Sequence, residues 1–151
     1  MGGREGVSIE MLSCAGKPVG HDGLPSMIHG IGTDIVAVAR MADYWQRHGE
    51  RGLEKLLAPD ERAACRDSHH PARFLAKRFA AKEALGKALG TGVRAPLLLP
   101  AVGISHDELG KPGFVFTAAL AAHLAERGLV AHLSISDEQD YAIAFVILEM
   151  P

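Results

Sequence analysis

The sequence PARFLAKRFAAKEALGKALGTG occupies residues 71–92 and decides the fold. Pro71 suits the first turn of a helix and Gly90 suits the residue that ends one, so the pattern predicts a helix over residues 71–89. A helical wheel places large apolar side chains on one broad face and alanines along much of the other. Little remains that could form an ordinary solvated face, and we therefore expect a long, central helix.

Charged side chains on this helix are the first candidates for chemistry. Arg78 and Lys82 fall within the apolar arc, and Glu83 and Lys87 lie at its edge, one turn apart. Buried charges are unfavourable unless they are paired or meet a charged ligand. In one interpretation Glu83 and Lys87 form a simple helix pair, while Arg78 and Lys82 extend to the surface. In the other, cations around a carboxylate beside the glycine turn at residues 90–92 form a site for polyphosphate and magnesium.

A second carboxylate candidate lies on a predicted strand over residues 28–36 (IHGIGTDIV). Asp34 shares one face of that strand with Gly30 and Gly32, which have no side chains to fill the space beside it. Such a glycine strip suits a ligand that approaches the backbone closely, such as a metal-bound phosphate. The alternative is that Asp34 ends the strand and caps the next helix. If the strand packs beside the long helix, Asp34 and Glu83 supply the carboxylates that magnesium prefers.

The rest of the chain predicts an α+β fold with a mostly antiparallel sheet around the long central helix. Further helices are expected over residues 38–48, 53–57, 59–69 and 118–127. Strand pairs are expected between residues 101–106 and 114–117 and between residues 131–136 and 141–148. Gly49 is expected to stop the first of these helices, and the Thr117 side chain to cap the last.

The chain length of 151 residues suits one domain with a real core. Residues 1–26 are rich in glycine and contain two prolines, so we expect a disordered extension followed by a domain over residues 27–151. No apolar run is long enough to span a bilayer, which argues against a membrane protein.

Charge and cysteine content narrow the function classes. The formal charge of −2 argues against a nucleic-acid-binding protein that depends on overall positive charge. The two cysteines, Cys14 and Cys65, have no CxxC spacing, which indicates neither a disulfide framework nor a zinc site. These features fit a reducing cytosol, so we expect a cytoplasmic protein.

Four motifs resemble those of one enzyme family, the holo-acyl-carrier-protein synthases of the 4′-phosphopantetheinyl transferase superfamily. Residues 30–36 (GIGTDIV), followed by Arg40, resemble the opening motif of these enzymes. Residues 74–84 (FLAKRFAAKEA), continued by Lys87 and the turn at residues 90–92, resemble their most diagnostic motif.

The two remaining motifs follow in the order and spacing of the family. They are Gly110-Lys111-Pro112 and the hairpin over residues 134–142, and the resemblance covers about residues 27–149. It implies a small α+β protein that assembles as a homotrimer with active sites between subunits. The implied reaction moves 4′-phosphopantetheine from coenzyme A to a serine of apo acyl carrier protein, releases 3′,5′-ADP and supports fatty acid biosynthesis.

The resemblance also implies catalytic roles for three residues. Asp34 and Glu83 are expected to hold Mg²⁺ bound to the coenzyme A diphosphate, and Lys87 is expected to neutralise phosphate charge. The serine proton needs a base, and Glu83, directly or through a metal-bound water, is the candidate.

Substrate and partner contacts are implied in the same way. Arg78 is expected near the nucleotide, whose site Ser136 and the turn Gly90-Thr91-Gly92 are expected to line, and Arg40 is expected to meet the acidic carrier protein. One departure concerns Asp137, because many members of the family have histidine after the serine of this motif. The acid puts any phosphate contact at that position in doubt.

Two alternatives remain open at this point. The first is a non-catalytic binding module, in which Arg40, Arg73, Lys77 and Arg78 form a basic patch for an acidic protein or a nucleic acid. Such a module would need no pair of acids. The second is a related transferase that serves a carrier of secondary metabolism. Those enzymes look like two fused copies of this unit, and the sequence has no such repeat.

Overall fold

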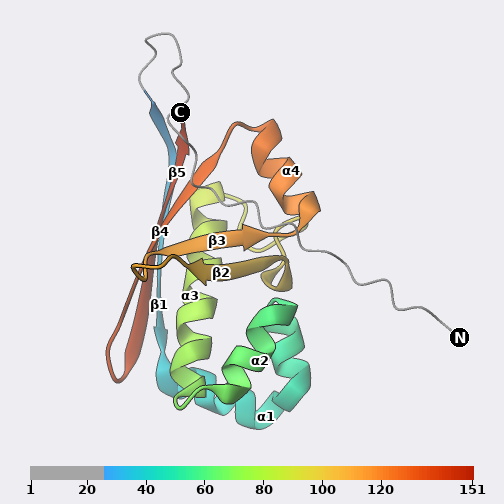
Figure 1. The fold of residues 1–151 in the computed structure, drawn as a ribbon, viewed down its shortest axis with the longest axis vertical. Helices are drawn as coiled ribbons and strands as arrows, with labels where there is room; N and C mark the ends of the chain where they lie inside the picture. The colour runs from blue at the N-terminus through green and yellow to red at the C-terminus, as the bar shows by residue number, and fades with distance from the viewer. Residues whose placement is uncertain (1–25) are drawn as a thin grey trace, which may run out of the picture.

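The computed structural model describes residues 26–151, and Figure 1 shows its helices and strands. The predicted extension over residues 1–26 lies outside this range except for its last residue. The elements in chain order are β1 (Met27–Ala37), α1 (Val38–Leu56), α2 (Pro59–Asp67), α3 (Pro71–Leu89), the short 3₁₀ helix η1 (Leu99–Ala101), β2 (Val102–His106), β3 (Pro112–Phe116), α4 (Ala118–Glu126), β4 (Val130–Asp137) and β5 (Tyr141–Met150). Within the described residues, no helix has the length and apolarity that crossing a membrane requires.

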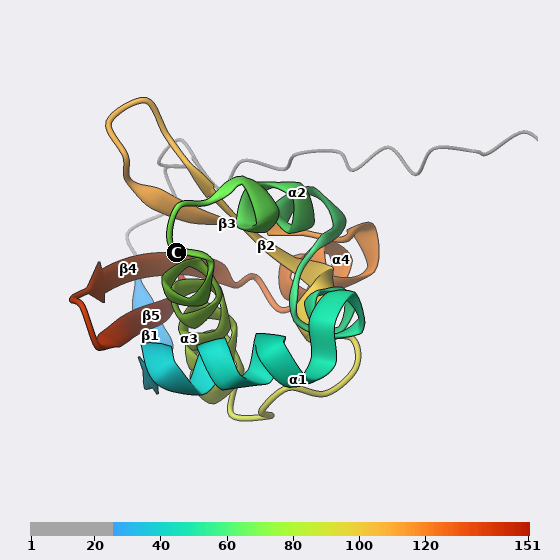
Figure 2. The ribbon, with the colours of Figure 1, turned by 90° about the horizontal axis from the view of Figure 1, so that it is seen from below.

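Both sheets are antiparallel, as the sequence predicted. The larger sheet has three strands in the order β1-β5-β4, and β2 pairs with β3 in a separate hairpin. In Figure 1 the larger sheet is seen edge-on, with α3 running along one of its faces. Figure 2 looks along α3 and shows the β2–β3 hairpin and α2 on the side of this helix away from the sheet. The prediction of an α+β fold around a central helix is confirmed.

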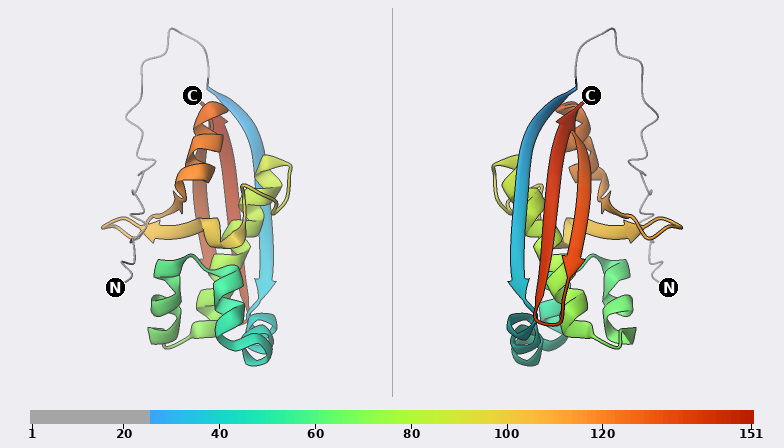
Figure 3. Two further views of the ribbon diagram at one scale, coloured as in Figure 1. Left: turned by 90° about the vertical axis from the view of Figure 1, so that its right-hand side faces the viewer. Right: turned by 90° about the vertical axis from the view of Figure 1, so that its left-hand side faces the viewer.

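The second face of the three-stranded sheet carries no helix of the described chain. Figure 3 shows this face directly in its right-hand view. Because side chains alternate along a strand, β1 directs Ile31 and Ile35 to this outer face and Gly32 and Asp34 to the inner face. Ile31 remains 60% exposed and Ile35 58% exposed. The sheet is thus apolar on both faces, although only one of them is covered.

Close contact between β1 and α3 depends on two glycines. A Cβ atom on Gly32 would lie 2.0 Å from the carbonyl oxygen of Ala84, and one on Gly30 would lie 2.0 Å from that of Ala88. The prediction of an open glycine strip for a ligand is therefore wrong, because the backbone of α3 fills that space. The glycines still serve the site, since they bring the helix close to the strand that carries Asp34.

The helix boundaries follow the sequence signals in most places. Helix α3 begins at Pro71 and is followed by Gly90, whose φ of 73° gives the left-handed cap that was predicted. The predicted break at Gly49 is a kink within α1, where this residue has a φ of 52°. The expected side-chain cap at Thr117 is wrong, because its side chain makes no capping hydrogen bond.

The core lies on both sides of α3. Large side chains with no exposed surface come from α3, β2, α4 and β5, and they include Leu75, Leu85, Val102, Leu120, Val146 and Leu148. Burying each such side chain is worth about 1.5–3 kcal/mol. Both sides of α3 are therefore fixed by packing, and so are the directions of its charged side chains.

Candidate active site

Asp34 and Lys87 meet where β1 lies against α3. The Lys87 ammonium donates hydrogen bonds to Asp34 Oδ1 at 2.8 Å and to the Thr33 carbonyl oxygen at 2.9 Å. Asp34 lies within β1, which continues to Ala37, and Ala37 is the residue that precedes α1. The alternative in which Asp34 caps the next helix is therefore wrong.

Glu83 lies close to the same pair. Partial burial raises the pKa of its carboxyl group, and the nearby negative charge of Asp34 raises it further. The positive charges of Lys87 and Arg40 act in the opposite direction. Arg40 itself is exposed on α1, with its guanidinium 5.6 Å from the centre of the Phe79 ring. The structure thus brings Asp34, Glu83 and Lys87 together, as the sequence predicted, and places Arg40 near them.

Arg78 and Lys82 lie elsewhere, in a buried cluster around Glu61. Lys82 is only 1% exposed, and its ammonium donates to Glu61 Oε2 and to the Leu56 carbonyl oxygen, each at 2.7 Å. Arg78 Nε lies 3.1 Å from Glu61 Oε1. Burial lowers the pKa of the Lys82 ammonium, and the charge of Glu61 opposes this effect. The interpretation in which Arg78 and Lys82 extend to the surface is wrong, and neither residue is paired with Glu83.

Glu61 was missed in the sequence. The available signal was its place in the first turn of a helix that opens Pro59-Asp60-Glu61, a pattern that indicates only a helix start. Indeed, its Oε2 accepts a hydrogen bond from the Ala58 backbone at 3.0 Å. The same carboxylate also accepts a hydrogen bond from Lys82, which is 21 positions away in the sequence. This is a tertiary contact, and local sequence does not reveal it.

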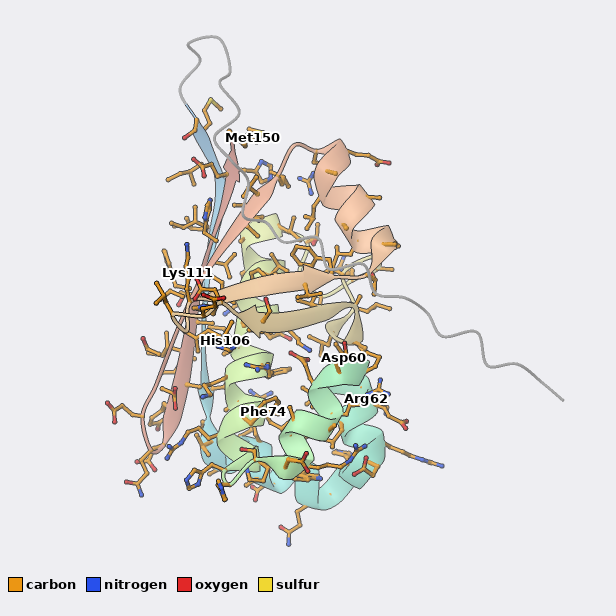
Figure 4. All side chains as sticks on the ribbon, in the orientation of Figure 1. Asp60, Arg62, Phe74, His106, Lys111 and Met150 are labelled. Carbon is orange, nitrogen blue, oxygen red and sulfur yellow. The ribbon has the colours of Figure 1, made fainter. Side chains whose placement is uncertain are left out.

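A second group of charges surrounds the start of α3. The Asp137 carboxylate lies 3.9 Å from Arg73 Nε and 3.6 Å from Lys77 Nζ, so the unusual acid is matched by two cations. His106, at the end of β2, has a pKa that is lowered by partial burial and then by the charges of Arg78 and Lys77. Figure 4 labels His106 together with Phe74, whose ring lies 4.4 Å from the Arg78 guanidinium.

The remaining predicted nucleotide contacts are Ser136 and the turn at residues 90–92, and Ser136 lies apart from Asp34. Ser136 pairs with Ile143 on the outer face of the sheet, whereas Asp34 is on the inner face. The turn Gly90-Thr91-Gly92 follows α3 directly, and its last residue donates a backbone hydrogen bond to the Gly86 carbonyl oxygen at 3.0 Å. Within one chain, the structure therefore does not unite all the predicted nucleotide contacts with the carboxylates.

The basic patch of the binding-module alternative is not formed as predicted. Arg78 is 8% exposed, and both Arg73 and Lys77 face Asp137. Of the four cations, only Arg40 is classed as an exposed residue. A surface of this kind offers an acidic partner or a nucleic acid few free charges.

Comparison with known proteins decides the family. Residues 30–146 match the family model of the 4′-phosphopantetheinyl transferase superfamily. The chain is 60% identical over 123 residues to the holo-[acyl-carrier-protein] synthase of Dechloromonas aromatica, an alignment that covers 82% of this chain and 98% of that protein. The corresponding enzyme of Azoarcus is 58% identical with the same coverage. This chain belongs to the holo-[acyl-carrier-protein] synthase family. The predicted resemblance is confirmed.

Solved structures of this family share the fold. The synthase of Neisseria meningitidis superposes with a TM-score of 0.78 at 44% identity, covering 81% of this chain and 98% of that one. The synthase of Helicobacter pylori in complex with coenzyme A gives a TM-score of 0.68 at 30% identity, covering 78% and 98%. Because these relatives match almost end to end, the alternative of two fused copies is not supported.

Proposed function

We propose that this chain transfers 4′-phosphopantetheine from coenzyme A to a serine of apo acyl carrier protein, releases 3′,5′-ADP and so supports fatty acid biosynthesis. The observation that carries the proposal is the group of Asp34, Glu83 and Lys87 between β1 and α3. It occurs in a chain that is 60% identical to a relative named for this activity. The reducing cytoplasm, which its cysteine usage fits, is the compartment that we propose.

The acids of this group fit Mg²⁺. Burial raises the pKa of Glu83 and the negative charge of Asp34 raises it further, so the two carboxylates repel each other and a divalent cation between them would relieve the repulsion. Among residues 26–151, no three His, Cys, Asp or Glu side chains are placed to hold a metal ion together. Two carboxylates match the preference of Mg²⁺ for one or two acids together with waters and phosphate oxygens. When bound, Mg²⁺ would offset negative charge on the diphosphate of coenzyme A.

The chain's own residues position the reactants and neutralise charge. The carrier serine oxygen forms a bond to the β-phosphorus of coenzyme A, and the bond from that phosphorus to the bridging oxygen breaks. The leaving 3′,5′-ADP keeps that oxygen, whose negative charge the Lys87 ammonium is placed to neutralise. Glu83 is the candidate to accept the serine proton, because a raised pKa makes it a better base than an ordinary carboxylate. Arg40, exposed beside Glu83, is suited to an acidic carrier protein.

The nucleotide contacts support a site shared between copies of the chain. Arg78 faces away from Glu83, since positions 78 and 83 point about 140° apart on a helix of 3.6 residues per turn. Ser136 lies on the opposite face of the sheet from Asp34. One coenzyme A molecule can meet both sets if the Arg78 and Ser136 side of one copy adjoins the carboxylates of the next.

The outer face of the sheet supplies the surface for such an assembly. Its exposed apolar side chains are contributed by β1 and β5 and include Ile28, Ile31, Ile35, Ile143 and Phe145. Contiguous exposed apolar patches of this kind mark interaction sites. We assign this outer face to contacts with further copies of this chain in a homotrimer. Ser136 lies on the same face, so the assignment brings a predicted nucleotide contact to the boundary between copies.

Phe145→Asp is expected to convert the assembly into single chains, because a carboxylate would be buried in the centre of the apolar face. Light scattering after gel filtration should report three chains for the unmodified protein and one for the variant. Leu109→Asp is the matched control, since Leu109 is 96% exposed on the β2–β3 turn, away from this face. Loss of assembly in both variants, or a monomeric starting protein, would contradict the assignment.

Transfer itself is tested by intact-mass analysis of apo acyl carrier protein incubated with this chain, coenzyme A and Mg²⁺. The carrier should gain one phosphopantetheine group, and EDTA should prevent the gain because the two carboxylates alone leave the diphosphate charge unbalanced. Adding excess Mg²⁺ back should restore it. An unchanged mass with several carrier proteins, and with Mn²⁺ in place of Mg²⁺, would reject the proposed function.

A further inference from the structure

We propose that Glu61 is a positioning residue, which holds the Arg78 guanidinium in the orientation that binds the phosphate on the ribose of coenzyme A. The proposal rests on the proposed function for its ligand, but its contacts are independent of the carboxylate pair of Asp34 and Glu83.

Glu61 is fixed by groups from three elements. It is 6% exposed at the start of α2. Its Oε1 accepts a hydrogen bond from the Ile104 backbone of β2 at 3.0 Å, and its Oε2 accepts from the Ala58 backbone at 3.0 Å and from Lys82 of α3 at 2.7 Å. A carboxylate held in this way has one available position, so it can serve as a fixed reference point for a neighbouring side chain.

The charge balance of this cluster leaves Arg78 in need of an anion. Glu61 carries one negative charge, whereas Lys82 and Arg78 carry one positive charge each. Lys82 makes the close charged hydrogen bond with Glu61. Arg78 Nε, 3.1 Å from Glu61 Oε1, is not aligned with it, and it is the buried side-chain nitrogen without a hydrogen-bond partner among the described residues. The excess positive charge therefore resides on the guanidinium.

Two contacts determine how that guanidinium is presented. Its Cζ atom lies over the Phe74 ring, 4.4 Å from the ring centre, and its Nε lies 3.1 Å from Glu61 Oε1. These two contacts restrict the directions in which the Nη groups can point. His106 lies near this region, because partial burial and then the positive charges of Arg78 and Lys77 lower its pKa.

The chemistry of coenzyme A selects the ligand group. The molecule carries a diphosphate and, separately, a phosphomonoester on the ribose. The diphosphate is assigned to Asp34, Glu83 and Lys87, which lie on another side of α3. The Nη groups of the planar Arg78 guanidinium suit the remaining phosphomonoester, which accepts paired hydrogen bonds.

The test compares two nucleotides that differ only in this group. Calorimetric titration should show that the protein binds 3′,5′-ADP more tightly than 5′-AMP. Glu61→Gln should lower this preference about tenfold or more, the scale of one charged hydrogen bond, with little change for 5′-AMP. Arg78→Gln should remove the same preference, and Glu61→Gln added to it should change nothing further. If Glu61 is merely structural, both nucleotides weaken equally.

Folding is controlled with a charge-balanced variant. Glu61→Gln alone leaves two buried cations without an acid, which can unfold the chain. The double variant Glu61→Gln with Lys82→Met removes one charge of each sign and should show the same lost preference in a folded protein. Glu50→Gln is the matched control, because Glu50 pairs with Arg66 at an exposed position. It should leave both affinities unchanged.

Transfer kinetics separate this proposal from the proposed function. Glu61→Gln should raise KM for coenzyme A, leave kcat nearly unchanged, and leave KM for 3′-dephospho-coenzyme A unaffected. If the protein transfers nothing but still prefers 3′,5′-ADP in a way that depends on Glu61, the positioning role of Glu61 stands and the proposed reaction is rejected. If the enzyme is active but Glu61→Gln changes KM equally for coenzyme A and for 3′-dephospho-coenzyme A, the positioning role of Glu61 is rejected and the proposed reaction stands.

Discussion

Glu83→Gln is expected to lower the rate of phosphopantetheine transfer by about 100- to 10,000-fold, the range for loss of a general base. The amide neither accepts the serine proton nor offers the second carboxylate for a cation. Burial, and then the nearby negative charge of Asp34, raise the pKa of Glu83, so the two acids lie close enough to act together and one without the other leaves an incomplete site. Intact-mass analysis of the carrier at a series of times measures the rate.

The fold should survive this change, because Glu83 is only partly buried and its side chain makes no hydrogen bond to the core within residues 26–151. Glu126→Gln, at the exposed end of α4, is the matched control and should keep the full rate. A Glu83→Gln variant with more than a tenth of the original rate would show that Glu83 neither accepts the proton nor completes the metal site.

Gly32→Ala is expected to lower the free energy of unfolding by about 3 kcal/mol or more, since overpacking of this severity exceeds what side-chain adjustment can absorb. The new Cβ would lie 2.0 Å from the Ala84 carbonyl oxygen, which belongs to the backbone of α3 and cannot rotate away. Urea denaturation followed by circular dichroism measures the change.

Gly113→Ala provides the comparison for this variant. Gly113 also lies in a strand, but the atom nearest to its added Cβ is Ser105 Oγ at 3.8 Å, an ordinary contact. Its stability should stay within about 0.5 kcal/mol of the original. Equal losses in the two variants would mean that strand glycines matter here for their flexibility and that the approach of α3 to β1 does not require Gly32.

Local signals predicted the fold well where they were chemically strong. Helix α3 was placed to the residue because Pro71 and Gly90 favour opposite ends of a helix. The hairpins followed from alternating apolar residues around turns. Asp34 and Glu83 were linked on the condition that the first strand packs beside the long helix, and this condition is met.

Apart from the local cap expected at Thr117, the errors concern contacts between distant elements. The space beside Gly30 and Gly32 was assigned to a ligand, since the sequence does not say which element will occupy it. Lys82 was linked to the acid next to it in sequence, whereas its partner Glu61 comes from another helix. Ser136 was expected to line the nucleotide site, and the sequence did not reveal that the pleat of the sheet directs it to the face opposite Asp34.

The contact of β1 with α3 has a consequence for how this enzyme can diverge. Backbone lies directly against backbone at Gly30 and Gly32, so the spacing between Asp34 and Glu83 is set by main-chain atoms. Core side chains elsewhere can change size and repack without altering that spacing. Sequences of this family can therefore drift widely in their interior while the two acids keep one geometry, provided that the two glycines are retained.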